Sequence, residues 1–358
     1  MSTQTGYNDA ANLGMREPED LFSPRHYAPV RQNGKLMRAL PLWAYTSERF
    51  WQAEKEKIFL TSWNLLERAE IVPNAGDFHT MTFLDVSLVI ARGNDDKVRV
   101  FANTCRHRGA KVVDGNGNCK FFRCPYHFWT YNLDGSLIGA PQYNAPDGKP
   151  LIDAGNKQEF GLVEIESGVW GGFIFIRLKP GKETLEQHLG VLVETLASHK
   201  LEDMRVARKV VYEMDANWKC FVENYIDAYH IPYVHKDSLA QWKSERYVNY
   251  EPRGAETLVF AVHDGSQLLL PMPGYDGFPP MPQIDADKKR GTFFMTVTPG
   301  MLMTMGNDGA LSDALCTLAE DEALRRNLGA ANRKRARADY DEKGWTGDTW
   351  LPPLSGPA

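Results

Sequence analysis

Long apolar runs are missing from this sequence of 358 residues, and none approaches the roughly 20 residues of a membrane-spanning helix. The N-terminal stretch MSTQTGYNDAANLGMREPEDLF has no apolar core, so we expect neither a secretion signal nor a membrane anchor there. A strong excess of charge is missing as well, because 41 Lys and Arg residues are offset by 46 Asp and Glu residues, a net charge of −5. These absences argue against a membrane protein and against a nucleic-acid-binding one.

Cysteine is scarce. The five cysteines are an odd number spread over a long chain, which disfavours a disulfide framework: Cys105, Cys119, Cys124, Cys220 and Cys316. Together with the missing secretion signal, this pattern predicts a reducing, cytoplasmic setting. In that setting, clustered Cys and His side chains usually bind metal.

The distribution of patterns predicts an N-terminal arm followed by two domains. Residues 1–42 are polar and proline-rich with no sustained period. Residues 43–180 hold short β-rich segments separated by turn signals such as GND and DGNGN, which predict an antiparallel β domain. Residues 181–358 mix helical and strand-like patterns, which predicts an α+β domain.

Three local predictions go with this division. Thr46 or Ser47 is the expected N-cap of a helix over ERFWQAEKEKIFLTSW. The segment ARKVVYEMDANWKCFVENYIDAYH is expected to run from a strand into a helix that ends at Pro232. The segments TLVFAV, SQLLL and TFFMTVT are expected to be strands of the second domain.

Two short motifs in the first domain each contain one cysteine and one histidine. They are Cys105-x-His107 and Cys124-x-x-His127, with sixteen residues between them. A zinc finger groups cysteine with cysteine and histidine with histidine along the chain, whereas here the two alternate. A Rieske [2Fe–2S] cluster needs two Cys on one iron and two His on the other, which this alternation supplies. A structural zinc site or unmetallated buried residues are the alternatives that a single motif would favour.

These motifs carry a family resemblance. CRHRGAKVV and CPYHFWTYNLDGSLIGAP resemble the Rieske domain in the large (alpha) subunit of Rieske non-heme iron oxygenases. That aromatic ring-hydroxylating family is related to the choline- and carnitine-type monooxygenases. The resemblance runs from LPLWAYTSERFWQAEKEKIF to about residue 305. It implies a Rieske domain over residues 43–180 and a helix-grip (START-like) catalytic domain over residues 181–358.

A second constellation lies in NWKCFVENYIDAYHIPYVHKDSL, where Asp227, His230 and His235 form the pattern D-x-x-H-x₄-H. We expect Asp227 and His230 on one helix face, with the chain turning at Pro232 so that His235 reaches the same point. Two His and one carboxylate form the facial triad of non-heme Fe(II) oxygenases. Taken alone, H-x₄-H on an aromatic-rich helix would more often mark core histidines.

The resemblance assigns roles to these residues. It implies that His230 and His235 bind the catalytic iron and that Asp227 links the cluster of one subunit to the iron of the next. Asn224 matches a polar residue near the iron.

The sequence departs from the family pattern after GTFFMTVTPGMLMTMGNDG, from about residue 309. The family's third iron ligand is a carboxylate on a C-terminal helix that follows a further strand, and neither is recognisable here. Asp321, Asp341 and Asp348 are candidates by residue type only. A divergent tail holding one of these acids, a truncated or frame-shifted tail, and a weaker iron held by two His and water are the three accounts that remain open.

The resemblance implies the oxygenase component of a multi-protein system that uses O₂ and electrons from an NAD(P)H-dependent reductase, with or without a ferredoxin. The chain has no G-x-G-x-x-G motif of its own, so the reductase is expected to be a separate partner. Electron transfer between subunits implies a homotrimer or a multiple of one.

Three interpretations of the substrate and activity follow. The apolar segment TLVFAVHDGSQLLLPMPGYDGFPP favours an aromatic or other small hydrophobic substrate, to be hydroxylated or demethylated. The alternative is a quaternary ammonium substrate held by cation–π contacts with Tyr225, Tyr229 and Tyr233. A Rieske electron-transfer protein with a degenerate iron site is the third interpretation.

Overall fold

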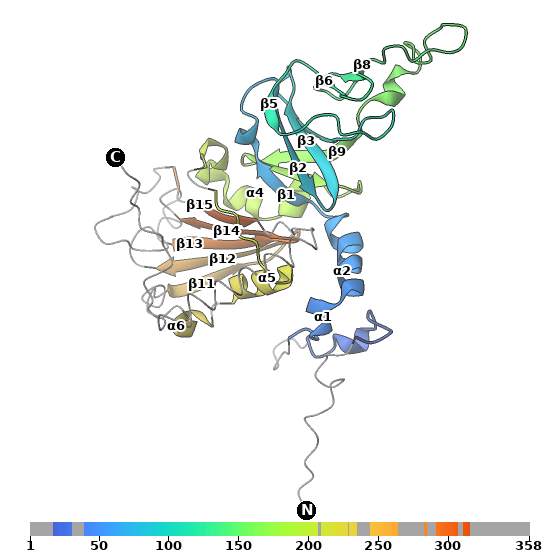
Figure 1. Ribbon diagram of the computed structural model, residues 1–358. Helices are drawn as coiled ribbons and strands as arrows, with labels where there is room; N and C mark the ends of the chain where they lie inside the picture. Colours follow the sequence, from blue (N-terminus) through green and yellow to red (C-terminus); the bar gives the residue numbers. More distant parts are fainter. Residues whose placement is uncertain are drawn as a thin grey trace, which may run out of the picture.

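The computed structural model describes residues 17–30, 39–206, 209–227, 229–234, 244–263, 283–284, 291–306 and 311–315. These residues form three antiparallel sheets and a set of short helices (Figure 1). No helix within these ranges is long and apolar enough to cross a membrane. Antiparallel sheets with separate helices make an α+β fold, which confirms the predicted class.

The N-terminal half is built on a seven-stranded sheet in the order β1-β10-β9-β4-β3-β2-β5, beside a small sheet in the order β6-β7-β8. Gly171 and Gly172 form the two-residue turn between β9 and β10, and both have the positive φ (56° and 79°) that tight hairpins of this kind require. The strands are β1 (Asn64–Arg68), β2 (Asp77–Phe83), β3 (Val86–Arg92), β4 (Val98–Ala102), β5 (Asn116–Asn118), β6 (Phe122–Arg123), β7 (Thr130–Tyr131), β8 (Leu137–Gly139), β9 (Glu164–Trp170) and β10 (Phe173–Arg177).

The C-terminal half is built on a five-stranded meander in the order β11-β12-β13-β14-β15. Its strands are β11 (Ser244–Tyr250), β12 (Glu256–His263), β13 (Gly291–Val297), β14 (Met301–Gly306) and β15 (Leu311–Leu315). Two of the predicted strands are thereby confirmed, and SQLLL lies outside the described residues. Strand β15 pairs antiparallel with β14, although the sequence showed no recognisable strand beyond residue 309. LSDAL contains no β-branched or aromatic residue, so propensity alone does not mark it as a strand.

The helices are short. They are α1 (Trp43–Thr46), α2 (Glu48–Glu54), which continues into a π-helical turn (Lys55–Phe59), α3 (Leu185–Leu189), α4 (Leu192–Thr195), α5 (Trp218–Ile226) and α6 (Ile231–Val234). Single 3₁₀ turns occur at Pro24–His26, Ala69–Ile71, Lys157–Phe160, Ala197–His199 and Leu201–Asp203. Ser47 is the N-cap of α2, and its side chain accepts a hydrogen bond from the Phe50 N–H at 3.1 Å. Ser47 was one of the two residues predicted for this position.

Two predictions for the segment around α5 were wrong. The helix does not continue to Pro232: it ends at Ile226, and Asp227 follows in an extended conformation (φ −86°, ψ 110°). Pro232 instead lies in the first turn of α6, a position where its missing N–H costs nothing. The described residues 209–214 are not part of a strand.

One apolar cluster includes side chains from both halves of the chain. Phe173 and Phe175 of β10 pack in this cluster with leucines of α3 and α4 and with Phe293 and Met295 of β13. These leucines are Leu185 and Leu189 of α3 and Leu192 of α4, and Leu196 directly after α4 belongs to the same cluster. Because one core contains both sheets and the helices between them, the two halves are packed together rather than joined by a free linker.

Phe175→Ala should destabilise the protein by roughly 3–5 kcal/mol, because Phe175 is fully buried and its removal leaves a cavity in this cluster. Thermal unfolding followed by circular dichroism measures the effect. Val169→Ala on the neighbouring strand β9 is the matched control, since Val169 is half exposed. Equal melting temperatures for the two variants would contradict the assignment of Phe175 to a shared core.

Candidate metal sites

The first Cys/His motif lies in the loop between β4 and β5. The Cys105 N–H donates to the Ala110 carbonyl at 2.8 Å, and the Cys105 carbonyl accepts the Gly109 N–H at 3.0 Å. Gly109 has a φ of 72°, which closes this turn without strain. The Asn103 side chain, 1% exposed, accepts the N–H groups of Val112 and Val113 at 3.1 Å and so fixes the far side of the loop.

The second motif, between β6 and β7, repeats the same backbone pattern. The Cys124 N–H donates to the Trp129 carbonyl at 2.9 Å, and the Cys124 carbonyl accepts the Phe128 N–H at 3.0 Å. Phe128, which corresponds to Gly109, also has a positive φ (57°), although it is not glycine. The two loops are therefore near-copies, each with its cysteine at the base.

In space the four side chains are sorted by type. The imidazoles of His107 and His127 lie edge to face with ring centroids 4.5 Å apart. Cys105 and Cys124 are both buried, and burial together with the adjoining Cys105 thiol raises the pKa of Cys124. The alternation along the sequence thus becomes a cysteine pair inside and a histidine pair at the rim.

These residues fit a [2Fe–2S] cluster. The buried Nδ1 of His107 has no hydrogen-bond partner, a state that metal ligation would relieve, and burial lowers the pKa of this imidazole, which favours the neutral form that binds metal. Two pairs of ligands match two irons with two protein ligands each.

Two aromatic residues support the ligands. The Trp129 ring stacks on His107, with centroids 4.9 Å apart and planes 5° apart, and this fixes the orientation of the imidazole. The Tyr131 hydroxyl lies 3.2 Å from the Cys105 Sγ and accepts the Arg106 N–H at 3.1 Å. Because the hydroxyl oxygen already accepts from Arg106, its own hydrogen is free to donate to the sulfur. The roles of Tyr131 and Asn103 do not follow from the spacing of the motifs, because their hydrogen bonds join segments that are separate in the sequence.

The second candidate site begins where α5 ends. Asp227 Oδ1 accepts the Tyr229 N–H at 2.7 Å, and Asp227 Oδ2 lies 3.2 Å from His230 Nδ1. The Tyr229 N–H and the neighbouring His230 hold the pKa of Asp227 below its usual range. An imidazole that donates from Nδ1 to a carboxylate presents Nε2 as a metal ligand, so this pair is suited to orient His230.

The remaining predicted residues of this site are not brought together by the described structure. Asn224 is exposed on α5. His235, Asp321, Asp341 and Asp348 lie outside the described residues. Asp227 and His230 are adjacent, as predicted, but through a cap-like turn after the helix rather than through one helix face.

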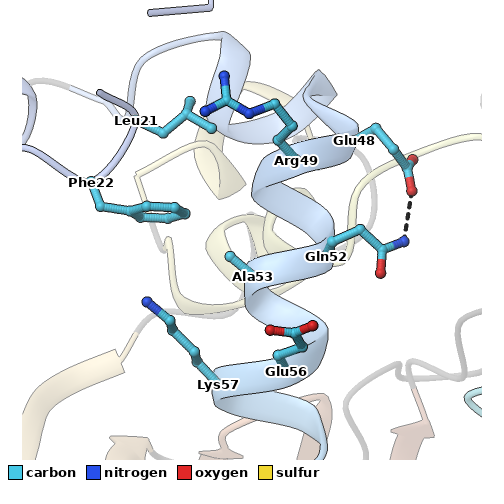
Figure 2. A pocket seen from close by; sticks show the side chains of 8 residues that line it. All are labelled: Leu21, Phe22, Glu48, Arg49, Gln52, Ala53, Glu56 and Lys57. Carbon is cyan, nitrogen blue, oxygen red and sulfur yellow. Dashed lines mark hydrogen bonds between the residues drawn. The ribbon is translucent and has the colours of Figure 1, made fainter. Parts of the chain in front are cut away.

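A shallow hollow on the exposed side of α2 is separate from both sites. It measures about 410 Å³ and lies between Leu21 and Phe22 of the N-terminal segment and the helix surface (Figure 2). Glu48 in its lining accepts a hydrogen bond from Gln52 at 2.8 Å. Its lining contains neither Cys nor His, and we assign it no role in metal binding.

Comparison with known families finds two matches in series. Residues 62–154 match the Rieske [2Fe–2S] domain, and residues 201–313 match the ring hydroxylating alpha subunit (catalytic domain). The chain is 33% identical over 194 residues to the carnitine monooxygenase oxygenase subunit of Acinetobacter pittii, covering 53% of this chain and 51% of that protein. It is 32% identical over 198 residues to the chloroplastic choline monooxygenase of Spinacia oleracea, covering 54% and 44%. The chain thus spans about half the length of the curated relatives it matches.

Solved structures share the fold. The quaternary ammonium Rieske monooxygenase CntA in complex with an inhibitor has a TM-score of 0.62 at 24% identity, covering 86% of this chain and 83% of that chain. Naphthalene 1,2-dioxygenase with indole bound in its active site has a TM-score of 0.53 at 23% identity, covering 81% and 74%.

Tyr131→Phe should lower the reduction potential of the reconstituted cluster by roughly 50 mV. The O–H···S hydrogen bond stabilises the reduced cluster, whose sulfur carries more negative charge, and the variant loses this stabilisation. Protein-film voltammetry measures the shift. Tyr143→Phe is the matched control, because it keeps the ring that packs against His107. An unchanged potential in Tyr131→Phe would mean that the hydroxyl does not donate to the sulfur.

Proposed function

Because the chain belongs to the Rieske oxygenases, with a Rieske [2Fe–2S] domain followed by a ring-hydroxylating catalytic domain, we propose that it is the oxygenase component of a Rieske-type non-heme iron oxygenase. The observation that carries this proposal is the sorting of four side chains into a buried cysteine pair and a histidine pair at the rim. A mononuclear iron in the second domain would be the place of oxygen chemistry.

In this proposal Cys105, His107, Cys124 and His127 hold the cluster, and His230 and His235 hold the iron. When bound, these groups supply single-electron transfer and the activation of O₂. Asp227 orients His230 and carries the negative charge that can couple a proton to the arriving electron. In the same proposal the electrons come from an NAD(P)H-dependent reductase partner, with or without a ferredoxin, in keeping with the resemblance to Rieske oxygenases.

We also propose that the working unit is a homotrimer or a multiple of one. Strand β6, which leads into Cys124, and helix α6, which follows His230, lie far apart in Figure 1, β6 near the top and α6 at the lower left. A cluster and an iron so placed within one chain are better connected through a second copy, whose Asp227 would approach the histidine rim.

For the substrate, we propose that a quaternary ammonium compound be tested beside aromatic ones. The segment that favoured an aromatic substrate lies mainly outside the described residues, whereas Tyr229 and Tyr233 beside His230 are exposed, with ring centroids 5.7 Å apart. Two rings in this arrangement suit a cation–π contact. Tyr225 does not join them, because its hydroxyl is bonded to the Met303 carbonyl (2.6 Å) and Thr304 (2.7 Å). The carnitine and choline monooxygenases among the relatives support the same substrate class.

Iron and acid-labile sulfide, measured together after anaerobic reconstitution, test the proposal. A cluster with a catalytic iron gives a ratio of roughly 3:2, and His230→Ala should reduce it to roughly 2:2. His79→Ala is the control, since His79 lies on β2 in the first domain. A ratio near 2:2 in the unmodified protein would favour an electron-transfer protein with a degenerate second site.

Asp227→Asn should retain both metals but slow oxidation of the reduced cluster by roughly 10–100-fold, because the variant keeps the shape of the side chain and loses its charge. Stopped-flow absorbance after mixing the reduced protein with O₂ and substrate gives the rate. Asp203→Asn is the control, because Asp203 lies in the 3₁₀ turn Leu201–Asp203, outside α5 and outside the Asp227–His230 turn. A normal rate in Asp227→Asn would exclude the bridging role.

A further inference from the structure

The N-terminal helices contact α5, the helix from whose end Asp227 and His230 extend. Lys219 on α5 and Glu54 on α2 form an ion pair with a Nζ–Oε1 distance of 2.7 Å, although the two residues are only 8% and 5% exposed. The Trp218 Nε1–H donates to the other Glu54 oxygen at 3.3 Å. The Lys219 ammonium also lies 5.1–5.5 Å from three aromatic ring centroids, those of Tyr45, Phe50 and Trp218.

A buried ion pair of this kind adds little net stability, because removing both charges from water opposes their attraction. Its directional contacts instead permit one placement of α5 against α2. A helix with only apolar contacts could slide or rotate at smaller cost.

A second polar contact lies one turn closer to the candidate iron site. The Tyr45 hydroxyl of α1 lies 2.8 and 2.9 Å from the two carboxylate oxygens of Glu223. The Glu223 backbone carbonyl in turn accepts the Asp227 N–H at 3.2 Å, which is the last hydrogen bond of the helix. Tyr45 also holds the start of α5, because its backbone carbonyl accepts a hydrogen bond from the side chain of Asn217, the N-cap residue, at 3.1 Å.

The opposite side of α5 is held by the second domain. The Tyr225 hydroxyl bonds to the Met303 carbonyl and the Thr304 hydroxyl of β14. The end of α5 is therefore fixed between the five-stranded sheet and the N-terminal helices.

We propose that Tyr45 is a positioning residue for the candidate iron site: through Glu223 it fixes the C-terminal end of α5, from which Asp227 and His230 extend. This inference rests on the proposed function for the identity of the metal site, and on the contacts above for the role of Tyr45. Helices α1 and α2 precede the Rieske strands in the chain, and through these contacts they help to set the position of α5 in the second domain.

The test uses the full-length protein with its cluster reconstituted and its mononuclear site stripped of iron. Hydrogen–deuterium exchange reports the local order of the Asp227–His230 turn without any metal there, and Co(II) titration followed by visible absorbance reports metal affinity. Tyr45→Phe keeps the ring beside Lys219 and removes only the hydroxyl that reaches Glu223. It should raise amide exchange at Asp227 and Tyr229 and weaken Co(II) binding, each by roughly fivefold.

Three further variants separate positioning from general destabilisation. Tyr27→Phe removes a hydroxyl of the same N-terminal region that donates to the Leu21 carbonyl at 2.5 Å, and it should leave both measurements unchanged. Glu223→Ala should reproduce the effect of Tyr45→Phe. Glu223→Gln keeps an oxygen that can accept the Tyr45 hydroxyl, so amide exchange and Co(II) affinity in this variant should stay near those of the unmodified protein.

Two results would overturn the proposal in distinguishable ways. Exchange and Co(II) affinity in Tyr45→Phe that match those of Tyr27→Phe would exclude the positioning role while leaving the iron site intact. Co(II) binding in the unmodified protein that equals that of His230→Ala would remove the iron-site assignment and this inference with it.

Discussion

The candidate cluster site depends on one backbone arrangement that occurs twice. In each loop a cysteine N–H donates to the carbonyl five residues ahead, and the cysteine carbonyl accepts the N–H four residues ahead. These bonds fix the backbone at Cys105 and Cys124, and both side chains are buried in the same apolar cluster. The histidines follow at different offsets, two residues after one cysteine and three after the other, yet their rings meet at 4.5 Å. A preformed arrangement of this kind is what a metal cluster with four protein ligands requires, because the free energy of binding is then not consumed in ordering the loops.

Helix α5 is held by a different kind of interaction. Trp218 of this helix is buried in an apolar cluster and Val222 packs against the same cluster, and polar contacts add to this attachment. Lys219, Glu223 and Tyr225 each form a directional contact with a different partner element, α2, α1 and β14. Polar contacts with defined geometry specify position more strictly than they add stability. A helix whose end presents a carboxylate and an imidazole benefits from that strictness, because a small displacement of ligands at a metal site has a large effect on affinity.

The chemistry of the first site was predictable from the sequence because it depends on residue identity and spacing. Cys and His alternate in residues 105–127, whereas a zinc finger groups cysteine with cysteine and histidine with histidine. This distinction can be made without knowing the fold. Tyr131 and Asn103 could not be found in this way, since their hydrogen bonds join segments that only folding brings together. The end of α5 was mispredicted because Pro232 was a visible stop signal, whereas the Asp227 side chain ends the helix first by accepting the Tyr229 N–H. Strand β15 was missed because its pairing with β14, not its composition, makes it a strand.

The two candidate sites share an electrostatic property that connects them with the proposed assembly. The His107 and His127 side chains are half-buried at the rim of their site, and the Asp227 side chain is 48% exposed. In a single chain, therefore, the two imidazoles and this carboxylate all contact water. In water a carboxylate and an imidazole attract each other weakly, because the solvent screens their charges and hydrates both. If a second chain covers both groups, the same contact becomes a hydrogen bond in a medium of lower dielectric constant, where it is stronger and directional. Assembly of the proposed trimer would therefore do more than shorten the electron path: it would create the environment in which Asp227 can hold an imidazole of each site at once.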